Sequence, residues 1–318
     1  VEWGQLETLY LGGGTPSLWG KRGAHFLHEF FKKRGLEISP TAEVTLEVNP
    51  GGWTEEGLQA WRELGVNRFS LGVQSYDSRF LKILDRIHSF DDVVETLSFF
   101  SQKQWNFSVD LMLGLPFSEN YDRDIQRELR ELLQFKPHHL SLYILTTKPQ
   151  YIHADYLPAD EWIEEEYLDV CKNLNSFGLP QYEVSNFAKP GFESQHNLQY
   201  WRSRPVAALG PSATGFFPHQ RYRYKWKTSR AEVIEEYLSP DSLLLERFYL
   251  QLRTIQGPWP EDYFQGRDLT EINGLIEDWK RTGLLDRGGP GQPLRLSSRG
   301  FLLLDSFMDQ IFSKTNSL

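Results

Sequence analysis

A run of three glycines, Gly12 to Gly14, followed by Thr15, is the part of the sequence best suited to bind a ligand through its backbone. Glycines let backbone N–H groups approach a ligand closely, and a threonine adds a hydroxyl beside them. The run matches neither of two common phosphate-binding patterns, GxxxxGK[ST] and GxGxxG. An ordinary tight turn also uses glycine, so the run indicates a binding loop only in combination with other residues.

Polar residues occupy comparable positions further along the chain. Each lies at or just past the end of an apolar strand pattern, or on the helix pattern that follows it: Glu47, Gln74, Arg86 and Asp110. A carboxylate in such a place accepts hydrogen bonds from an amine or a ribose, although each residue taken singly could equally be bound to a neighbouring loop. The C-terminal strand ends of a parallel α/β barrel lie on one face, so the residues taken together favour a shared site.

His196 is a candidate of a different kind, with Asn197, Tyr200 and Trp201 close to it in the sequence. An imidazole can coordinate heme iron, and aromatic rings can cover a porphyrin face. A single histidine is more often structural, so the residues alone leave both interpretations open.

The elements that must position these residues alternate between strand and helix patterns up to about residue 190. Strands are predicted over residues 6–11, 44–48, 68–73, 108–113, 139–144 and 182–185. Helices are predicted between them, over residues 55–64, 78–87, 92–104, 122–135 and 161–177. This order is typical of an α/β fold built on a parallel sheet.

The alternation stops after residue 190, which predicts a division into a barrel over residues 1–190, a loop-rich connecting region over 191–239 and a C-terminal domain over 240–318. In the last part, helices over residues 242–252, 270–282 and 299–312 flank a hairpin around the turn at 288–291. Two helices, a hairpin and a further helix indicate a mainly helical, winged-helix-like module. With no basic recognition face, this module is expected to pack or bind a partner, not DNA.

Composition limits the classes of partner. The 318 residues carry a net charge of -9, which disfavours nucleic acid. The most basic stretch, Arg221 to Arg230, is interpreted as a solvated or interdomain surface, with binding of carboxylates or RNA as alternatives. There is no apolar run of about 20 residues and no signal-peptide pattern, so a cytoplasmic protein is expected. Cys171, the sole cysteine, is interpreted as a buried thiol.

Taken in order, these segments resemble the family of radical S-adenosylmethionine (SAM) proteins that contains HemW-type heme chaperones and oxygen-independent coproporphyrinogen oxidases. The matching segments run from residue 12 to residue 211: GGGTPS at 12–17, LEVNP at 46–50, GVNR at 65–68, GVQS at 72–75, RIH at 86–88, DLMLGLP at 110–116, YEVSNFA at 182–188, HNLQYW at 196–201 and GP at 210–211.

The resemblance implies a partial (β/α)6 barrel that opens onto SAM. It implies that Gly13, Gly14 and Thr15 bind the methionine end, and that the rest of SAM is surrounded by Glu47, Gln74, Arg86 and Asp110. His196 is implied as a heme ligand, because HemW-type members hold heme with an HNxxYW motif. The leading hypothesis is therefore a HemW-like heme chaperone that passes heme to a recipient hemoprotein, and that contacts a membrane only peripherally, through that recipient.

One feature departs from the family pattern. In the family, a CxxxCxxC loop on the first barrel strand holds a 4Fe-4S cluster, and Cys171 cannot supply three thiolates. We therefore expect the cluster ligands and the first strand to lie upstream of Val1, and the chain as given not to cleave SAM.

Two alternatives to the chaperone hypothesis stay open. One is an oxygen-independent coproporphyrinogen III oxidase, a radical SAM decarboxylase of porphyrin biosynthesis, in which the basic stretch would pair the substrate propionates. The other is a non-catalytic scaffold that keeps the fold without the cofactor.

Overall fold

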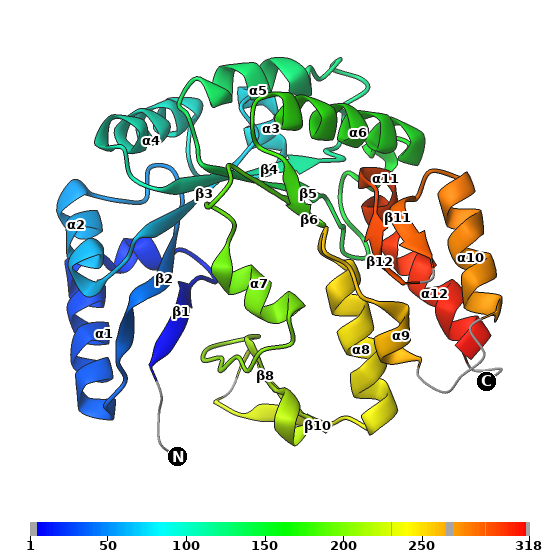
Figure 1. Ribbon diagram of the computed structural model, residues 1–318. Helices are drawn as coiled ribbons and strands as arrows, with labels where there is room; N and C mark the ends of the chain where they lie inside the picture. The colour runs from blue at the N-terminus through cyan, green and yellow to red at the C-terminus, as the bar shows by residue number, and fades with distance from the viewer. Residues whose placement is uncertain (1–4, 230, 265–269, 290, 316–318) are drawn as a thin grey trace. The chain divides into compact units, whose positions relative to one another are not determined.

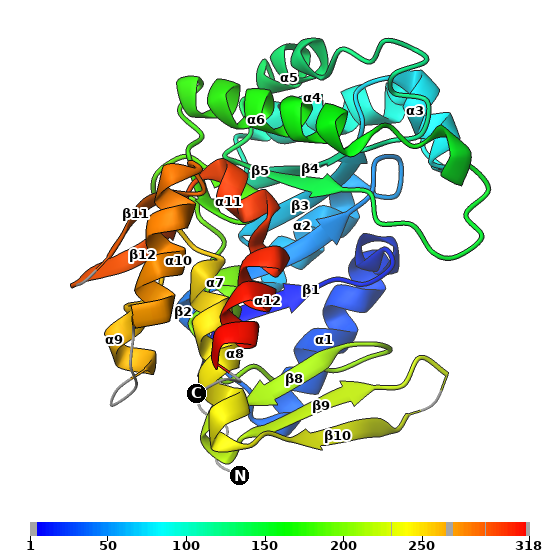
Figure 2. The same ribbon diagram turned by 90° about the vertical axis from the view of Figure 1, so that its right-hand side faces the viewer.

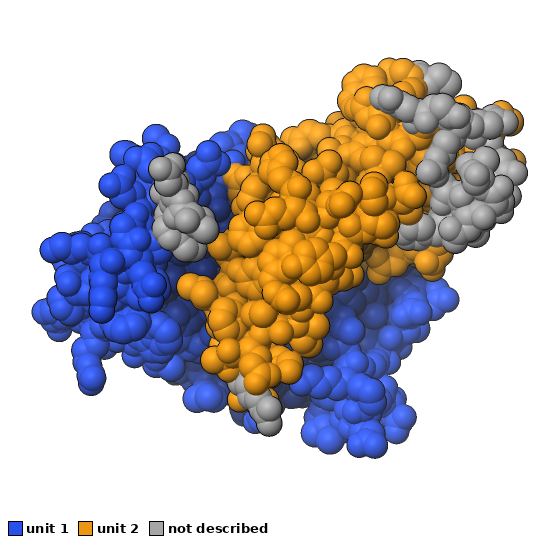
Figure 3. Space-filling view, turned by 90° about the horizontal axis from the view of Figure 1, so that it is seen from below, with its two compact units in different colours: residues 1–181, 185–196 blue, residues 182–184, 197–318 orange. Residues whose placement is uncertain are grey.

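The computed structural model describes residues 5–229, 231–264, 270–289 and 291–315. The chain divides into two compact units, coloured separately in Figure 3. Unit 1 contains Val1–Gln181 and Ser185–His196, and unit 2 contains Tyr182–Val184 and Asn197–Leu318. The division falls inside one helix, α7 (Gln195–Trp201).

Unit 1 is built on a curled sheet. Its parallel strands lie side by side in chain order: β1 (Leu6–Leu11), β2 (Ile38–Val48), β3 (Arg68–Gln74), β4 (Phe107–Leu113) and β5 (His139–Ile144). The helices line the convex side of the sheet (Figure 1): α1 (Gly20–Arg34), α2 (Glu55–Leu64), α3 (Ser78–Ile83), α4 (Phe90–Lys103), α5 (Ile125–Leu133) and α6 (Asp160–Ser176). Short 3-10 turns cover η1 (Pro16–Trp19) and η2 (Ala154–Tyr156). The expected α/β fold with a parallel sheet is confirmed.

The alternation of residue types along the strands decides which side chains face the helices. In β2 the apolar residues Val44, Leu46 and Val48 are almost fully buried. Successive side chains of a strand point to opposite faces, so Glu43, Thr45 and Glu47 face the other way. With the helices on the convex side, the polar set of each strand faces the concave side.

The connection after β3 differs from the prediction. The helix expected over residues 78–87 ends at Ile83, because Asp85 adopts a left-handed backbone conformation with φ 51°. A residue in that conformation cannot continue an α-helix. Arg86 therefore lies in the connection between α3 and α4, and α4 begins anew with a capping box formed by Ser89 and Asp92.

The strand expected over residues 182–185 is confirmed only in its first half. The structure has two short strands, β6 (Gln181–Glu183) and β7 (Asn186–Ala188), separated by a turn at Val184–Ser185. The turn interrupts the strand pattern, and β7 pairs antiparallel with β5. Pairing of short strands is decided by tertiary neighbours, which a propensity pattern does not contain.

Unit 2 starts with an antiparallel sheet of β8 (Thr214–Phe217), β9 (Tyr222–Trp226) and β10 (Val233–Tyr237), shown in Figure 2, with η3 (Pro218–Gln220) between the first two strands. The region expected to be loop-rich thus contains α7 and a sheet. Tyr222 and Tyr224 lie on one face of β9, and their ring centroids are 5.8 Å apart. Aromatic residues on alternate positions stabilise a strand by such contacts.

The remainder of unit 2 has its own core. It contains α8 (Pro240–Leu252), α9 (Pro260–Tyr263), α10 (Thr270–Arg281), the hairpin β11 (Leu285–Gly289) with β12 (Gln292–Leu296), α11 (Ser298–Leu302) and α12 (Leu304–Thr315). Phe248, Trp279 and Phe307 are buried at the centre of this core. The single helix expected over 299–312 is interrupted at Leu303, and Pro290 of the predicted hairpin turn lies outside the described residues. None of the helices in the described ranges is long and apolar enough to cross a membrane.

Candidate functional site

The glycine loop follows β1 and has two different reasons for its glycines. Gly13 and Gly14 have φ values of 81° and 84°, a region that favours glycine, and a Cβ atom on either would meet nothing within 4 Å. At Gly12, a Cβ atom would lie 2.5 Å from the Tyr10 ring and 2.7 Å from a Glu47 oxygen. Packing therefore requires Gly12, while Gly13 and Gly14 expose backbone that a ligand can approach.

Glu47 joins this loop to the strands. Its Oε2 atom accepts a hydrogen bond from the Gly13 N–H at 2.9 Å, and its Oε1 atom accepts one from the Tyr10 hydroxyl at 2.8 Å. Burial, and then the charge of Glu47, raise the pKa of Tyr10 well above its ordinary value, so the phenol keeps its proton and donates. The structure thus brings together Gly13 and Glu47, both predicted, with Tyr10, which the prediction missed.

Thr15 and Arg86 meet at a third residue, Asn49. The Asn49 side-chain N–H donates to Thr15 Oγ1 at 2.7 Å, and Arg86 Nη2 donates to Asn49 Oδ1 at 3.0 Å. Gly72 is needed here because a Cβ atom would lie 2.6 Å from Asn49 Oδ1. Gln74, at the end of β3, has a left-handed backbone with φ 69°. Its side-chain amide nitrogen is also close to Gly72: a Cβ atom on Gly72 would lie 3.4 Å from it. Thr15, Gln74 and Arg86 therefore lie around one amide.

Asp110 lies on β4, on the face of the sheet that carries the polar residues. The Ser70 hydroxyl lies 3.3 Å and 3.2 Å from its carboxylate oxygens. Burial raises the pKa of Asp110 to about 6, against hydrogen bonding from Ser141 and the positive charge of Arg68, both of which lower it. A carboxyl group with this pKa can accept a hydrogen bond in one protonation state and donate one in the other near neutral pH.

The start of α7 is held by a carboxylate on β2. Glu43 accepts hydrogen bonds from the backbone N–H groups of Gln195 at 3.0 Å and His196 at 2.9 Å. Arg68 Nε lies 3.9 Å from Glu43 Oε2. A helix N-terminus presents N–H groups without partners inside the helix and favours negative charge, so Glu43 fixes where α7 begins.

His196 is oriented by β1. Its Nδ1 atom lies 3.0 Å from Thr8 Oγ1, and its ring stacks on Tyr10 with centroids 5.3 Å apart and an interplanar angle of 25°. Burial, and then the positive charge of Arg68, lower the pKa of His196 to about 4. The imidazole is therefore neutral near pH 7, which is the form that coordinates metals.

Sequence reasoning missed three residues that support this site, Thr8, Tyr10 and Glu43. Asn49 and Arg68 were noted only as members of matching segments, without a role of their own. For Glu43, the sequence contained a usable signal. The period of two along β2 places Glu43 on the same face as Glu47. Nothing local in the sequence, however, shows that Glu43 meets residues 195 and 196.

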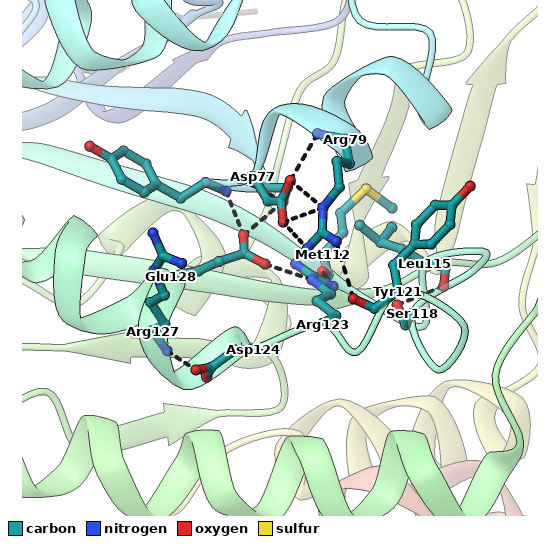
Figure 4. Close-up of polar contacts among 12 residues, drawn as sticks. Asp77, Arg79, Met112, Leu115, Ser118, Tyr121, Arg123, Asp124, Arg127 and Glu128 are labelled. Atoms are coloured by element: carbon teal, nitrogen blue, oxygen red, sulfur yellow. Dashed lines mark hydrogen bonds and ion pairs between the residues drawn. The ribbon is translucent and has the colours of Figure 1, made fainter.

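A buried ion pair supports the ends of β3 and β4 (Figure 4). Arg123 Nε and Glu128 Oε1 are 2.7 Å apart, and the two side chains are 0% and 6% exposed. Glu128 also accepts hydrogen bonds from the Ser75 hydroxyl, directly after β3, and from the Tyr76 N–H. Arg123 donates to the Met112 carbonyl on β4 at 2.8 Å. The pair therefore ties together the strands that carry Gln74 and Asp110.

The chain does not supply the ligands of an iron–sulfur cluster. Its sole cysteine, Cys171, is buried in α6. Within the part of the chain that the structure describes, no group of three or more His, Cys, Asp or Glu residues could hold a metal ion. A 4Fe-4S cluster usually needs three or four thiolates, so the residues present do not fit one.

The basic stretch has partners of its own. Arg223 forms ion pairs with Glu236 at 2.8 Å and with Glu246 at 2.9 Å, and Lys227 pairs with Glu232 at 2.9 Å. Arg230 lies outside the described residues. Because Arg223 and Lys227 are already paired with carboxylates, these two cations are poorly suited to bind propionates.

Comparison with known proteins identifies the family. Residues 1–129 match the family model described as the radical SAM superfamily. The chain is 34% identical to the heme chaperone HemW of Escherichia coli over 293 residues, which are 89% of this chain and 74% of that protein. It is 36% identical to the mitochondrial radical S-adenosyl methionine domain-containing protein 1 of Bos taurus, and the match covers 98% of this chain and 76% of that protein. The chain belongs to the HemW-like family of radical SAM proteins.

The chain spans less than two thirds of the length of some HemW proteins. It matches 65% of the length of HemW from Synechocystis, at 32% identity, and 56% of the length of HemW from Buchnera aphidicola, at 33% identity. Among solved structures, coproporphyrinogen III oxidase (HemN) from Escherichia coli, described as a radical SAM enzyme, matches with a TM-score of 0.77 at 17% identity, over 96% of this chain and 77% of that one. This likeness confirms the fold class. Family membership implies SAM and a 4Fe-4S cluster as the family's cofactors.

Proposed function

We propose that this protein binds heme and passes it to a recipient hemoprotein, the activity that the names of its HemW relatives describe. The observation that carries the proposal is the state of His196. It lies in the first turn of a helix whose start is fixed by Glu43, its ring is oriented by Thr8 and Tyr10, and its imidazole is neutral. A neutral imidazole with a fixed ring is suited to ligate heme iron.

The tautomer follows from the same contacts. If Nδ1–H donates to Thr8 Oγ1, the lone pair lies on Nε2, and Nε2 would be the atom that holds the iron.

The second part of the proposal is a SAM site at the concave strand ends. Gly13, Gly14 and Thr15 would bind the methionine end, and Glu47, Gln74, Arg86 and Asp110 would surround the rest. The exposed backbone at Gly13 and Gly14 and the carboxylates on β2 and β4 support this assignment, because an amine and ribose hydroxyls need acceptors. SAM supplies radical chemistry when it is reduced by a cluster. The residues of this chain do not fit a cluster, so their proposed role is binding.

The cellular setting belongs to the same proposal. The recipient is a hemoprotein, and the protein acts in the cytoplasm, with contact to a membrane only where the recipient is membrane-bound. No nucleic acid takes part, in keeping with the net charge of -9.

A titration with hemin tests the heme site. His196→Ala is expected to bind hemin at least about tenfold more weakly than the wild type, followed by the Soret absorbance band, because an iron ligand is lost. His28→Ala, at an exposed position on α1, is the matched control and should titrate like the wild type. Equal hemin affinity of wild type and His196→Ala would contradict the role of His196.

A further inference from the structure

An unbroken series of contacts runs from His196 to the glycine loop. The His196 ring stacks on the Tyr10 ring at 5.3 Å. The Tyr10 hydroxyl donates to one oxygen of Glu47 at 2.8 Å, and the other oxygen of Glu47 accepts the Gly13 N–H at 2.9 Å. All of these residues belong to unit 1. Tyr10 therefore contacts both the proposed heme ligand and the carboxylate that holds the loop.

The geometry around Tyr10 leaves little freedom for independent movement. A Cβ atom at Gly12 would lie 2.5 Å from the Tyr10 ring, so ring and loop backbone are packed against each other. The Tyr10 hydroxyl is the donor and Glu47 Oε1 is the acceptor of the bond between them. A displacement of the Tyr10 ring therefore changes the hydrogen bond from the Tyr10 hydroxyl to Glu47. Because Glu47 also accepts the Gly13 N–H, that second hydrogen bond changes too.

We propose that Tyr10 is a positioning residue that couples ligation of heme at His196 to the conformation of the glycine loop, residues 12–17. The inference rests on the proposed function, because it takes His196 as the heme ligand and the loop as part of the SAM site. Heme ligation acts on the His196 ring, the stacked Tyr10 ring responds, and the hydrogen bond that the Gly13 N–H donates to Glu47 changes. Coupling of this kind is reciprocal, so a ligand on the loop changes the heme affinity by the same factor.

Hydrogen exchange measured by mass spectrometry on the full chain tests the coupling with hemin as the probe. In the wild type, saturating hemin is expected to change the exchange rate of the segment from Gly12 to Ser17 by about fivefold, the effect of one hydrogen bond of ordinary strength. Tyr10→Phe keeps the ring against His196 and removes only the hydroxyl, so this response should disappear. Tyr121→Phe, whose ring packs on Phe117, is the matched control and should retain it.

The outcomes separate the two proposals. Absence of a Soret shift in the wild type sinks the proposed heme function and the coupling with it. Hemin binding without any change in the loop, or a change that persists in Tyr10→Phe, overturns the coupling alone. If Tyr10→Phe does not fold, Glu47→Gln is the second variant. It leaves Tyr10 and His196 unchanged and has one acceptor oxygen in place of two, so it cannot accept both the Tyr10 hydroxyl and the Gly13 N–H as Glu47 does. An unchanged loop response in Glu47→Gln overturns the coupling as well.

Discussion

At the scale of single residues, the site depends on carboxylates whose oxygens hold two segments at once. Glu47 joins Tyr10 to Gly13, and Glu43 holds the backbone of residues 195 and 196 from a strand about 150 positions earlier. A carboxylate has about four acceptor positions, which makes such bridging possible. Glu43 therefore places a proposed ligand residue through the backbone, and Glu47 holds the glycine loop as well as being a proposed SAM-binding residue.

Glu166 in α6 is a carboxyl group without such partners. It is 9% exposed, and neither of its oxygens has a hydrogen-bond partner. Burial raises its pKa to about 7 against the charge of Arg123, from an ordinary value of 4.5. A pKa raised in the folded state contributes stability that is complete below the unfolded-state value and is lost as the pH rises through 7.

Glu166→Gln should remove this pH dependence. Between pH 5 and pH 8, the wild type is expected to lose about 2 kcal/mol of unfolding free energy through the ionisation of Glu166. The glutamine variant has no ionisable group at this position, so it should not show this loss. Urea unfolding at both pH values measures the difference. Glu165→Gln, at the exposed neighbouring position, is the control. A pH dependence in Glu166→Gln as steep as in the wild type would count against a buried, titrating Glu166.

At the scale of elements, the site is assembled from loops that follow successive parallel strands. Glu47, on β2, and Asn49, in the loop after β2, bind the loop after β1, and Arg86, between α3 and α4, binds Asn49. The ends of β3 and β4 are tied by the Arg123–Glu128 pair (Figure 4). A buried ion pair contributes little net stability, but removing one partner leaves an uncompensated buried charge. The pair therefore matters most for the relative position of the strand ends.

A double-mutant cycle tests this interpretation. Arg123→Met alone should lower the unfolding free energy of unit 1 by about 3–5 kcal/mol, and Arg123→Met combined with Glu128→Leu should lower it by less. Urea unfolding monitored by tryptophan fluorescence provides the measurement. Arg127→Met with Glu131→Leu, an exposed pair on the same helix, should cost less than about 1 kcal/mol. Additive losses for the buried pair would show that the two charges do not depend on each other.

At the scale of the whole molecule, each unit has its own core. The core of unit 2 contains Trp279 and Phe307, whose ring centroids are 3.3 Å apart. Phe307→Ala should destabilise this core by about 3–5 kcal/mol, because it leaves a cavity. Hydrogen exchange should then accelerate in α10 and α12 and remain unchanged in the glycine loop of unit 1. Equal acceleration in both places would show that the chain unfolds as one cooperative unit.

The sequence by itself determined the fold class, most of the strands of unit 1 and the family. Period-two alternation and glycine turns are local properties, and they place Gly13 and Glu47 near strand ends. The same expectation was wrong for Asp110, which lies in the middle of β4. Only the tertiary structure decided that His196 lies against Thr8 and Tyr10, that Arg86 leaves its helix and that β7 runs antiparallel. These features arise from contacts between residues far apart in the chain, whose energies depend on packing and burial and leave no periodic signal in the sequence.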